Sequence, residues 1–237
     1  MDIIEIERIK DAYKKRGEKI PLFFYSSLKR ANLYMLQRRE WEIIRMFERE
    51  KIKNLVDMEV LDLGCGDGGE LRRLQSYGAR PEKLHGIDLL DGRVLRGRAI
   101  SPNIDIRCGD ASSLPYDNAV FDLVMQFTVF TSILDRCMKS KIAAEMLRVL
   151  KPGGFIIWYD FHVNNPGNHD VRGIGGKEIA RLFPGCGVRL KRITLAPPLV
   201  RCLVRYSPLS CYLLEKIRLL NSHYLGTIRK ETVSPLS

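Results

Sequence analysis

The sequence predicts an α/β protein built on a doubly wound, mostly parallel sheet. Two observations predict this class: short apolar runs alternate with helical stretches from residue 58 onward, and alternating glycines follow the first of those runs. Strands that alternate with helices imply βαβ units, whose strands pair in parallel. The 237 residues are 45% apolar, 28% charged and 8% aromatic. That composition is enough for a full core and excludes a disordered or collagen-like chain.

Residues 1–57 are expected to form a helical cap in front of a sheet domain over residues 58–237. Pro21 separates a short, charged helix at about 3–16 from a longer helix at about 26–53. The longer segment has apolar side chains mostly at helical spacing, at Leu33, Leu36, Ile43, Ile44 and Phe47.

The elements of the sheet domain follow in chain order. Strands are expected near residues 58–63, 83–88, 104–108, 120–126 and 154–161. Helices are expected between them near residues 68–77, 91–99 and 135–150. After a loop rich in Asn, Gly and His, we expect a helix around 177–183, a strand around 187–195, a helical segment over 197–220 and a last strand at 223–230.

Most of the positive charge lies near the end of the chain. The 39 Lys and Arg minus 28 Asp and Glu give +11, and residues 189–230 hold nine basic side chains against one acid, Glu215. Such an excess favours an acidic partner, which leaves nucleic acid, anionic lipid and phosphorylated substrates open. The segment 197–220 is both apolar and cationic. It is therefore either a lid on the sheet edge or a patch for a lipid-linked or phosphate-bearing acceptor or an anionic membrane surface.

The chain is expected to be cytoplasmic, with peripheral contact to the inner face of the membrane left open by the basic segment. No run approaches the roughly 20 apolar residues that span a bilayer, and the first residues alternate charged with apolar side chains, unlike a secretion signal. The six cysteines form no C-x-x-C pair. No metal site is expected, and the oligomeric state is left open.

The strongest motif is the decapeptide Val60-Leu61-Asp62-Leu63-Gly64-Cys65-Gly66-Asp67-Gly68-Gly69. Glycines after an apolar strand let the backbone turn tightly and approach a ligand where a Cβ would collide. Gly64, Gly66 and Gly69 also satisfy the dinucleotide pattern G-x-G-x-x-G, so the loop alone leaves a nicotinamide cofactor open. A Walker loop is excluded because no Gly-Lys-Ser/Thr follows.

Three carboxylates near the ends of successive strands favour an adenosyl ligand. Asp62, two residues before the first glycine, suits a ligand with positive charge and disfavours a pyrophosphate. Asp88 ends the next strand, where a carboxylate can accept hydrogen bonds from both ribose hydroxyls. Asp110 follows the third strand and can accept from an adenine amino group, beside the N–H of Ala111. We expect the three carboxylates to share one cavity.

This set of motifs resembles the class I S-adenosylmethionine-dependent methyltransferases, particularly the small-molecule, ubiquinone-biosynthesis-like branch (methyltransferase type 11). The resemblance extends in order over Val60–Gly68, Gly86–Leu89, Gly109–Pro115, Phe121–Phe127 and Arg148–Gly154. It implies a Rossmann-like, seven-stranded sheet with an antiparallel last strand, N-terminal helices folded over the site, and S-adenosyl-L-methionine as cofactor. It places Gly64, Cys65, Gly66 and Gln126 at the methionine part, Asp88 at the ribose, Asp110 and Ala111 at the adenine, and Asp62, Gly68 and Leu89 beside the same ligand.

The resulting hypothesis is methyl transfer to a small-molecule acceptor, a hydroxyl of a sugar, a lipid-linked precursor or another metabolite. The transfer is an in-line displacement, so the protein mainly aligns the reactants and excludes water. A hydroxyl acceptor also needs a base, and the candidates follow the fifth strand: His162 first, then His169. Tyr25, Tyr159 and Arg172 are candidate substrate contacts. Core packing or solvent exposure stays open as the alternative for each of these five.

Three other functions compete with this hypothesis. A nucleic-acid (RNA) methyltransferase would use the basic C-terminal region, although the chain lacks the usual amino-methylation motif, a Pro-Cys or Thr-Cys nucleophile and an RNA-binding appendage. A nicotinamide-dependent dehydrogenase shares the glycine pattern, but Asp62 and the Gly109-Asp110-Ala111 turn argue against it. A non-catalytic binding protein would keep the cofactor pocket alone.

Overall fold

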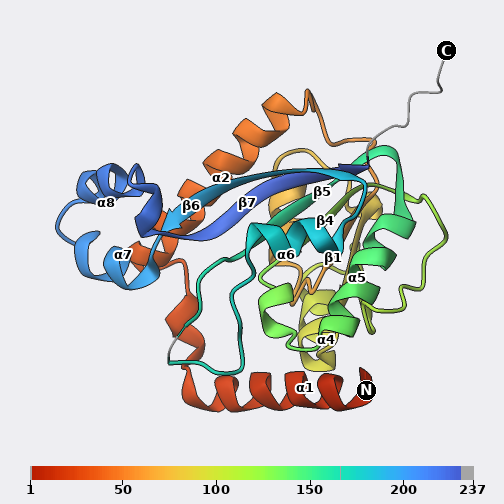
Figure 1. The fold of residues 1–237 in the computed structure, drawn as a ribbon, viewed down its shortest axis with the longest axis horizontal. Coiled ribbons are helices and arrows are strands. Elements are labelled where there is room, and N and C mark those ends of the chain that lie inside the picture. Colours follow the sequence, from red (N-terminus) through yellow and green to blue (C-terminus); the bar gives the residue numbers. More distant parts are fainter. Residues whose placement is uncertain (1, 166, 231–237) are drawn as a thin grey trace.

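A seven-stranded sheet runs through the molecule in the order β3-β2-β1-β4-β5-β7-β6 (Figure 1). The computed structural model describes residues 2–165 and 167–230. Within them β7 runs antiparallel to both its neighbours, and the other strand pairs are parallel. The strands are β1 (Val60–Leu63), β2 (Leu84–Asp88), β3 (Asp105–Cys108), β4 (Phe121–Phe127), β5 (Leu150–Phe161), β6 (Cys186–Leu195) and β7 (Asn221–Lys230). The predicted fold class is confirmed, including its antiparallel last strand.

Helices cover both faces of this sheet. They are α1 (Asp2–Lys19), α2 (Arg30–Arg49), α3 (Gly69–Ser76), α4 (Asp91–Ile100), α5 (Arg136–Val149), α6 (Gly176–Leu182), α7 (Pro197–Leu203) and α8 (Pro208–Glu215). Short 3-10 turns are η1 (Leu22–Tyr25), η2 (Pro81–Lys83), η3 (Phe130–Ser132) and η4 (Arg218–Leu220). None of the helices in the described part of the chain combines the length and the apolar character that crossing a bilayer requires.

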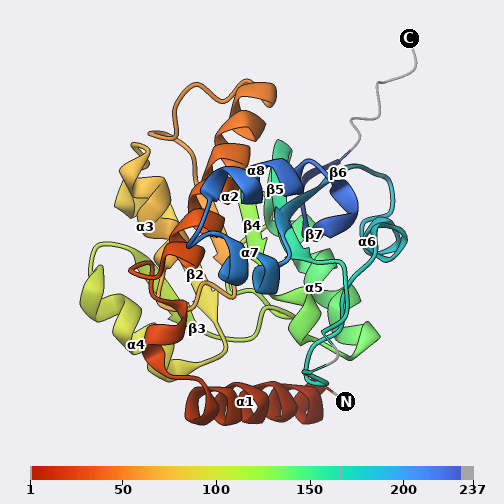
Figure 2. The same ribbon diagram turned by 90° about the vertical axis from the view of Figure 1, so that its left-hand side faces the viewer.

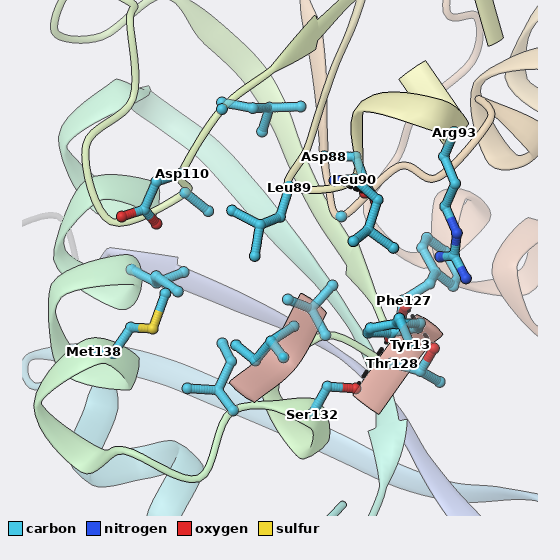
Figure 3. Close-up of a pocket in the computed structure, with 18 residues that line it drawn as sticks. Tyr13, Asp88, Leu89, Leu90, Arg93, Asp110, Phe127, Thr128, Ser132 and Met138 are labelled. Atoms are coloured by element: carbon cyan, nitrogen blue, oxygen red, sulfur yellow. Dashed lines mark hydrogen bonds between the residues drawn. The ribbon is translucent and has the colours of Figure 1, made fainter. Parts of the chain in front are cut away.

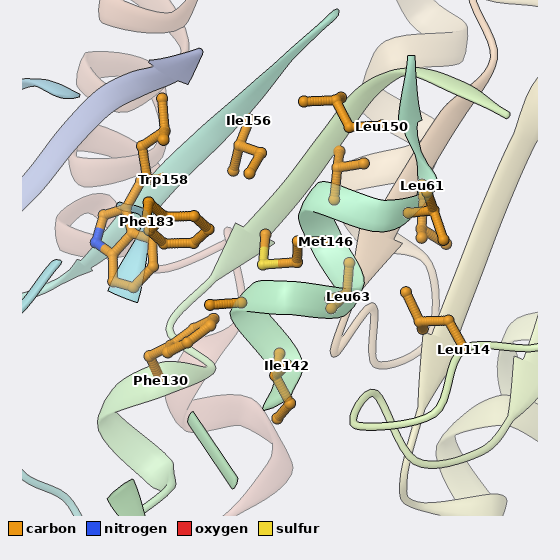
Figure 4. Packing of buried hydrophobic residues seen from close by; sticks show 14 of the residues in the cluster. Leu61, Leu63, Leu114, Phe130, Ile142, Met146, Leu150, Ile156, Trp158 and Phe183 are labelled. Carbon is orange, nitrogen blue, oxygen red and sulfur yellow. The ribbon is translucent and has the colours of Figure 1, made fainter. Parts of the chain in front are cut away.

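Alternating side chains on the strands divide the core into two layers. On one face Leu61 and Leu63 of β1 pack with α5 and α6, and Trp158 of β5 packs between Phe130 and Phe183 (Figure 4). On the other face a second layer joins the sheet to α2, α3 and α4. Burial of both faces is what a parallel sheet requires, and it fixes the carboxyl ends of the strands in place.

The two N-terminal helices occupy different positions. Helix α1 crosses the molecule at the carboxyl edge of the sheet, at the bottom of Figure 1. Helix α2 packs against a sheet face, where Ile43, Met46 and Phe47 belong to the core layer shared with β1 and α3. The first 57 residues are thus continuous with the core of the sheet domain.

The segment 197–220 forms two short helices instead of one longer helix. Pro208 begins α8, and the Ser207 hydroxyl caps it by accepting from the Ser210 N–H at 3.2 Å. The two helices enclose a small apolar cluster of their own, formed by Leu195, Val200, Val204 and Cys211, against which Tyr34 and Met35 of α2 pack. We call α7, α8 and the residues up to Leu220 the α7–α8 lobe, which projects at the left of Figure 1.

Candidate functional site

A cavity lies between the carboxyl ends of β1 to β4 and α1 (Figure 3). Its empty volume is about 720 Å³ when the space open to solvent is included. Five of the ten predicted cofactor residues line it: Gly64, Asp88, Leu89, Asp110 and Ala111.

The glycine loop after β1 forms one wall because a side chain does not fit there. Gly64 has φ +65°, and a Cβ on it would lie 2.5 Å from the Val129 Cγ2. The N–H groups of Gly64 and Cys65 both donate to the Ile87 carbonyl, at 2.8 and 3.1 Å, which fixes the loop to β2. Gly68, at φ +81°, begins α3. Only glycine suits the backbone conformation at these two positions without strain.

Asp88 ends β2 with its carboxylate held against the same loop. Its Oδ2 accepts from the Gly66 N–H at 2.8 Å, and its Oδ1 accepts from the Leu90 N–H at 2.9 Å. An ionised carboxylate offers about four lone-pair sites, so both oxygens keep acceptor capacity toward the cavity. The geometry suits a vicinal diol such as a ribose.

Asp110 lies in a tight turn at the cavity wall. Its Oδ1 accepts from the Ser112 N–H at 2.8 Å, and its Oδ2 accepts from the Ser112 hydroxyl at 2.5 Å. Apolar side chains of the neighbouring wall include Leu89, Ile133 and Met138. A flat apolar ring with a polar edge matches this combination of surfaces.

Helix α1 covers the cavity. Ile9 and Tyr13 line it, and the Tyr13 hydroxyl lies 3.1 Å from the Ser132 Oγ (Figure 3). The Arg93 guanidinium of α4 lies 4.6 Å from the centre of the Tyr13 ring, a cation–π contact. Contacts from both α4 and η3 therefore hold Tyr13 over the cavity.

A partly buried ion pair, formed by Arg8 and Glu5, anchors α1. Arg8 donates to both Glu5 oxygens at 2.8 Å and also to the Ser132 carbonyl at 2.6 Å, while Glu5 accepts from the Leu134 N–H at 2.6 Å. Burial raises the pKa of Glu5, but its bonds from Arg8, Leu134 and Asp135 outweigh that effect and lower it overall. Glu5 is thus held ionised, as an anchor needs.

Substituting the anchor is expected to loosen α1. In Glu5→Gln we expect faster amide exchange along α1 and about tenfold weaker binding of S-adenosylhomocysteine, because a charge-assisted hydrogen bond contributes about 1.5–3 kcal/mol. Exchange mass spectrometry and calorimetry measure the two effects. Glu7→Gln, at an exposed position of the same helix, is the matched control. Unchanged exchange in Glu5→Gln would contradict the anchoring role.

Asp62 does not line the cavity, which corrects the expectation that three carboxylates share it. Its side chain is 2% exposed and lies on the α2 side of the sheet, with no hydrogen bond from a described residue to its Oδ1. Burial, together with the charges of Glu70 and Asp88, raises its pKa well above the usual range. Arg39 of α2, which pairs with Glu70, opposes that shift.

The remaining predicted cofactor residues support the wall from behind. Gln126 is fully buried, and its Oε1 accepts from the Val129 N–H at 3.1 Å while its Nε2 has no partner among the described residues. Cys65 is buried against Gly86, and burial raises the pKa of its thiol. Gly66 and Gly68 shape the loop without lining the cavity.

Neither predicted base, His162 or His169, lines the cavity, and a catalytic role for either stays a prediction. His162 lies beside β7, where its Nε2 donates to the Asn221 carbonyl at 2.8 Å and its ring packs on Tyr224. Burial lowers its pKa. His169 is exposed in the loop before α6.

The predicted substrate contacts also lie away from the lining. Tyr25 is half exposed on η1, and its hydroxyl accepts from Arg16 at 2.6 Å. Tyr159 is buried, with its hydroxyl 3.0 Å from the Thr194 Oγ1. The side chain of Arg172 is exposed, and its backbone N–H donates to the Thr131 carbonyl at 2.8 Å. None of the three lines the cavity, and a role in substrate contact stays a prediction for each.

Sequence reasoning missed the lining residues at the end of β4 and directly after it. Phe127, Thr128 and Val129 all line the cavity, and Thr128 has φ +59°. A non-glycine residue in that region is uncommon and concentrates at functional sites. Arg93 was missed as well, because an arginine on an exposed helix carries no signal of the ring it will contact.

The lining residues fit an adenosyl sulfonium donor. A glycine cradle that any Cβ would obstruct, a diol-binding carboxylate and apolar walls match its methionine, ribose and adenine parts. The charged side chains of the lining are Asp88, Asp110 and Arg93, so carboxylates predominate, which suits a cation and disfavours a pyrophosphate. No group of three or more metal-ligating side chains occurs in residues 2–165 and 167–230.

Comparison with known proteins agrees with this geometry. Residues 60–154 match a family model described as a methyltransferase domain. A protein named as a probable S-adenosylmethionine-dependent methyltransferase of Mycolicibacterium smegmatis is 33% identical over 104 residues, 42% of this chain and 36% of that protein. A sterol 4-C-methyltransferase of Caenorhabditis elegans is 32% identical over 129 residues, 51% of this chain and 36% of that protein. The matched segments thus span little more than a third of these relatives.

Solved structures share the fold. An S-adenosylmethionine-dependent methyltransferase from Mesorhizobium loti superposes with a TM-score of 0.58 at 17% identity, covering 83% of this chain and all of that one. The similarity extends well beyond residues 60–154 and includes most of the sheet.

Proposed function

We propose that this chain, whose residues 60–154 match a methyltransferase-domain model, transfers the methyl group of S-adenosylmethionine to a lipid or lipid-linked small molecule. The observation that carries the proposal is the cavity at the carboxyl edge of the sheet, with its glycine cradle at Gly64 and the carboxylate of Asp88. A ligand site at this edge is the general rule for open α/β sheets.

We assign the donor contacts as follows. Asp88 accepts from the ribose hydroxyls, Asp110 and the Ala111 N–H bind the adenine edge, and the loop at Gly64 lies along the methionine part. Gln126 holds the chain after β4 by accepting from the Val129 N–H, and Asp62 lies buried behind this part with an unpartnered Oδ1. The bound sulfonium supplies an electrophilic methyl group.

The chain itself contributes alignment and exclusion of water to the transfer. Tyr13 and Ile9 of α1 cover the cavity. Glu5 and Arg8 anchor this helix, so that it keeps solvent from the reacting groups. Restricting two reactants to one geometry is the main source of rate in an in-line displacement. No histidine belongs to the lining of the described cavity, so we assign no general base.

The lipid nature of the acceptor rests on two observations. One relative acts on a sterol by its name, and the lobe that follows β6 exposes apolar side chains. A hydroxyl of a lipid-linked sugar or of another lipid-linked precursor remains within this proposal. Nothing in the comparisons favours RNA, and that alternative is not carried forward.

Two measurements test the function. Calorimetry with S-adenosylmethionine, S-adenosylhomocysteine and NAD should give binding of the first two and none of the third. Incubation with methyl-labelled cofactor and a host extract, separated into organic, aqueous and RNA fractions, should place the label in the organic fraction. Binding of NAD alone would end the methyltransferase assignment, and label confined to the aqueous or RNA fraction would end the assignment of a lipid acceptor.

A further inference from the structure

The α7–α8 lobe exposes a run of large apolar side chains. In α8, Leu209 and Leu213 lie four residues apart on one face and are 64% and 58% exposed, whereas Cys211 on the opposite face is buried. Ile217 and Leu219 continue the surface after α8, and Leu219 is 83% exposed. Single exposed apolar residues need no explanation, but a contiguous set marks an interaction surface.

The charge of the lobe surface is entirely positive. Arg201, Arg205, Lys216 and Arg218 are exposed, and none of them pairs with a carboxylate among the described residues. Arg205 and Lys216 lie over the rings of Tyr206 and Tyr212, each at 4.4 Å. The one acid of the lobe, Glu215, has a side chain only 8% exposed and accepts from Arg38 of α2 at 2.7 Å. The negative charge thus faces inward.

The segment before α2 extends this surface. The Arg201 guanidinium lies 4.7 Å from the centre of the Phe24 ring, which joins α7 to η1. Phe23 is 55% exposed and Leu28 85% exposed beside it. Figures 1 and 2 show α7 and α8 together beside the chain that leads from α1 to α2, away from α5. We call the lobe surface and η1 together the apolar-cationic surface.

We propose that the apolar-cationic surface binds the face of an anionic lipid bilayer. Aliphatic side chains enter the boundary between headgroups and acyl chains, and arginine or lysine side chains around them pair with anionic headgroups. RNA offers nothing that would bury Leu209, Leu213 and Leu219, since it binds through charge and ring stacking. A second copy of the chain would bring the same cations face to face.

Binding of this surface would bring the N-terminal cover of the cavity close to the bilayer. Helix η1 follows α1 directly in the chain, and α1 carries Tyr13 over the cavity. The inference goes beyond the proposed function and does not depend on it, because the surface residues do not line the cavity.

Flotation of the full chain with vesicles tests the proposal. We expect binding to phosphatidylcholine vesicles that contain phosphatidylglycerol and about tenfold or more weaker binding to pure phosphatidylcholine. Leu209→Ser with Leu213→Ser should weaken binding by about tenfold or more, because each exposed leucine gains free energy only by entering the bilayer. Arg205→Gln with Arg218→Gln should weaken it about tenfold on anionic vesicles only.

Matched controls lie elsewhere on the surface. Ile100→Ser at the end of α4, where Ile100 is 52% exposed, and Arg181→Gln on α6 should leave vesicle binding unchanged. Equal loss in the controls, binding to RNA at physiological salt without vesicle binding, or a dimer in light scattering that the leucine variant dissociates would each overturn the proposal.

Calorimetry with S-adenosylhomocysteine on the same variants keeps this result separate from the proposed function. Retained ligand affinity in a variant that has lost vesicle binding supports the assignment of the surface. Vesicle binding by a wild-type chain that binds no S-adenosylhomocysteine would overturn the proposed function and support the surface assignment.

Discussion

Gly64→Ala is expected to abolish measurable binding of S-adenosylhomocysteine while the protein still folds. The new methyl group would lie 2.5 Å from the Val129 Cγ2 at φ +65°. A left-handed non-glycine residue costs about 1–2 kcal/mol, and overpacking costs about 1–3 kcal/mol more. Relief of that overpacking would displace Val129 and the glycine loop, which both form part of the cavity wall. We therefore expect the affinity for S-adenosylhomocysteine to fall by about 100-fold or more. Calorimetry measures the loss, and thermal unfolding confirms that the variant is folded.

Two further variants separate the backbone strain from the lost space. Gly78→Ala is a matched control because Gly78 has φ +97° and nothing within 4 Å of an added Cβ, so it should lower stability by about 1 kcal/mol and leave affinity unchanged. Gly64→Ala with Val129→Ala removes the contacting methyl groups and should recover part of the affinity. If Gly64→Ala binds S-adenosylhomocysteine within threefold of the wild type, the cradle assignment is wrong.

The sheet and most of the cavity wall were predictable because both depend on local patterns. Apolar runs that end in glycine or aspartate gave the strand ends, and parallel strands bring such ends to one edge. Asp88 and Asp110 follow from that rule alone. Asp62 departs from it because β1 continues through Leu63, so Asp62 is still inside the strand, and alternation turns its side chain to the α2 side with Val60.

The predicted site residues that lie away from the cavity are placed by contacts between residues far apart in the sequence. His162 follows β5, but β5 pairs with β7 up to Phe161 opposite His223, and this pairing holds His162 beside Asn221. The position of Tyr13 over the cavity also depends on contacts between residues far apart in the sequence. Tyr13 lies against Ser132 and Arg93. It is held there because Glu5 and Arg8 anchor α1 to η3 and to the residues that follow η3. No pattern of spacing or composition records these long-range contacts.

Asp88→Asn is expected to weaken S-adenosylhomocysteine binding by about 10-fold to 100-fold. A hydrogen bond to a charged acceptor contributes about 1.5–3 kcal/mol, and the amide loses the charge and one of the two acceptors that receive the Gly66 and Leu90 N–H groups. Asp122→Asn is the matched control. Asp122 on β4 also accepts a backbone N–H, from Glu59 at 2.9 Å, but it pairs with Lys151 and does not line the site cavity.

Loss of affinity in Asp88→Asn alone would not separate contact with the ribose from support of the loop. A thermodynamic cycle separates the two roles. The wild type and Asp88→Asn are each titrated with S-adenosylhomocysteine and with its 2′-deoxy analogue, and a coupling energy appears only if Asp88 and the 2′-hydroxyl interact. If Asp88 accepts from the ribose, the wild type should lose about tenfold in affinity for the deoxy ligand, and Asp88→Asn should bind both ligands almost equally. If the two losses simply add, Asp88 acts on the loop through Gly66, and the ribose assignment has to be given up. The proposed contact of Asp110 with the adenine would then need its own test, because the position of the ribose in the cavity would no longer be assigned.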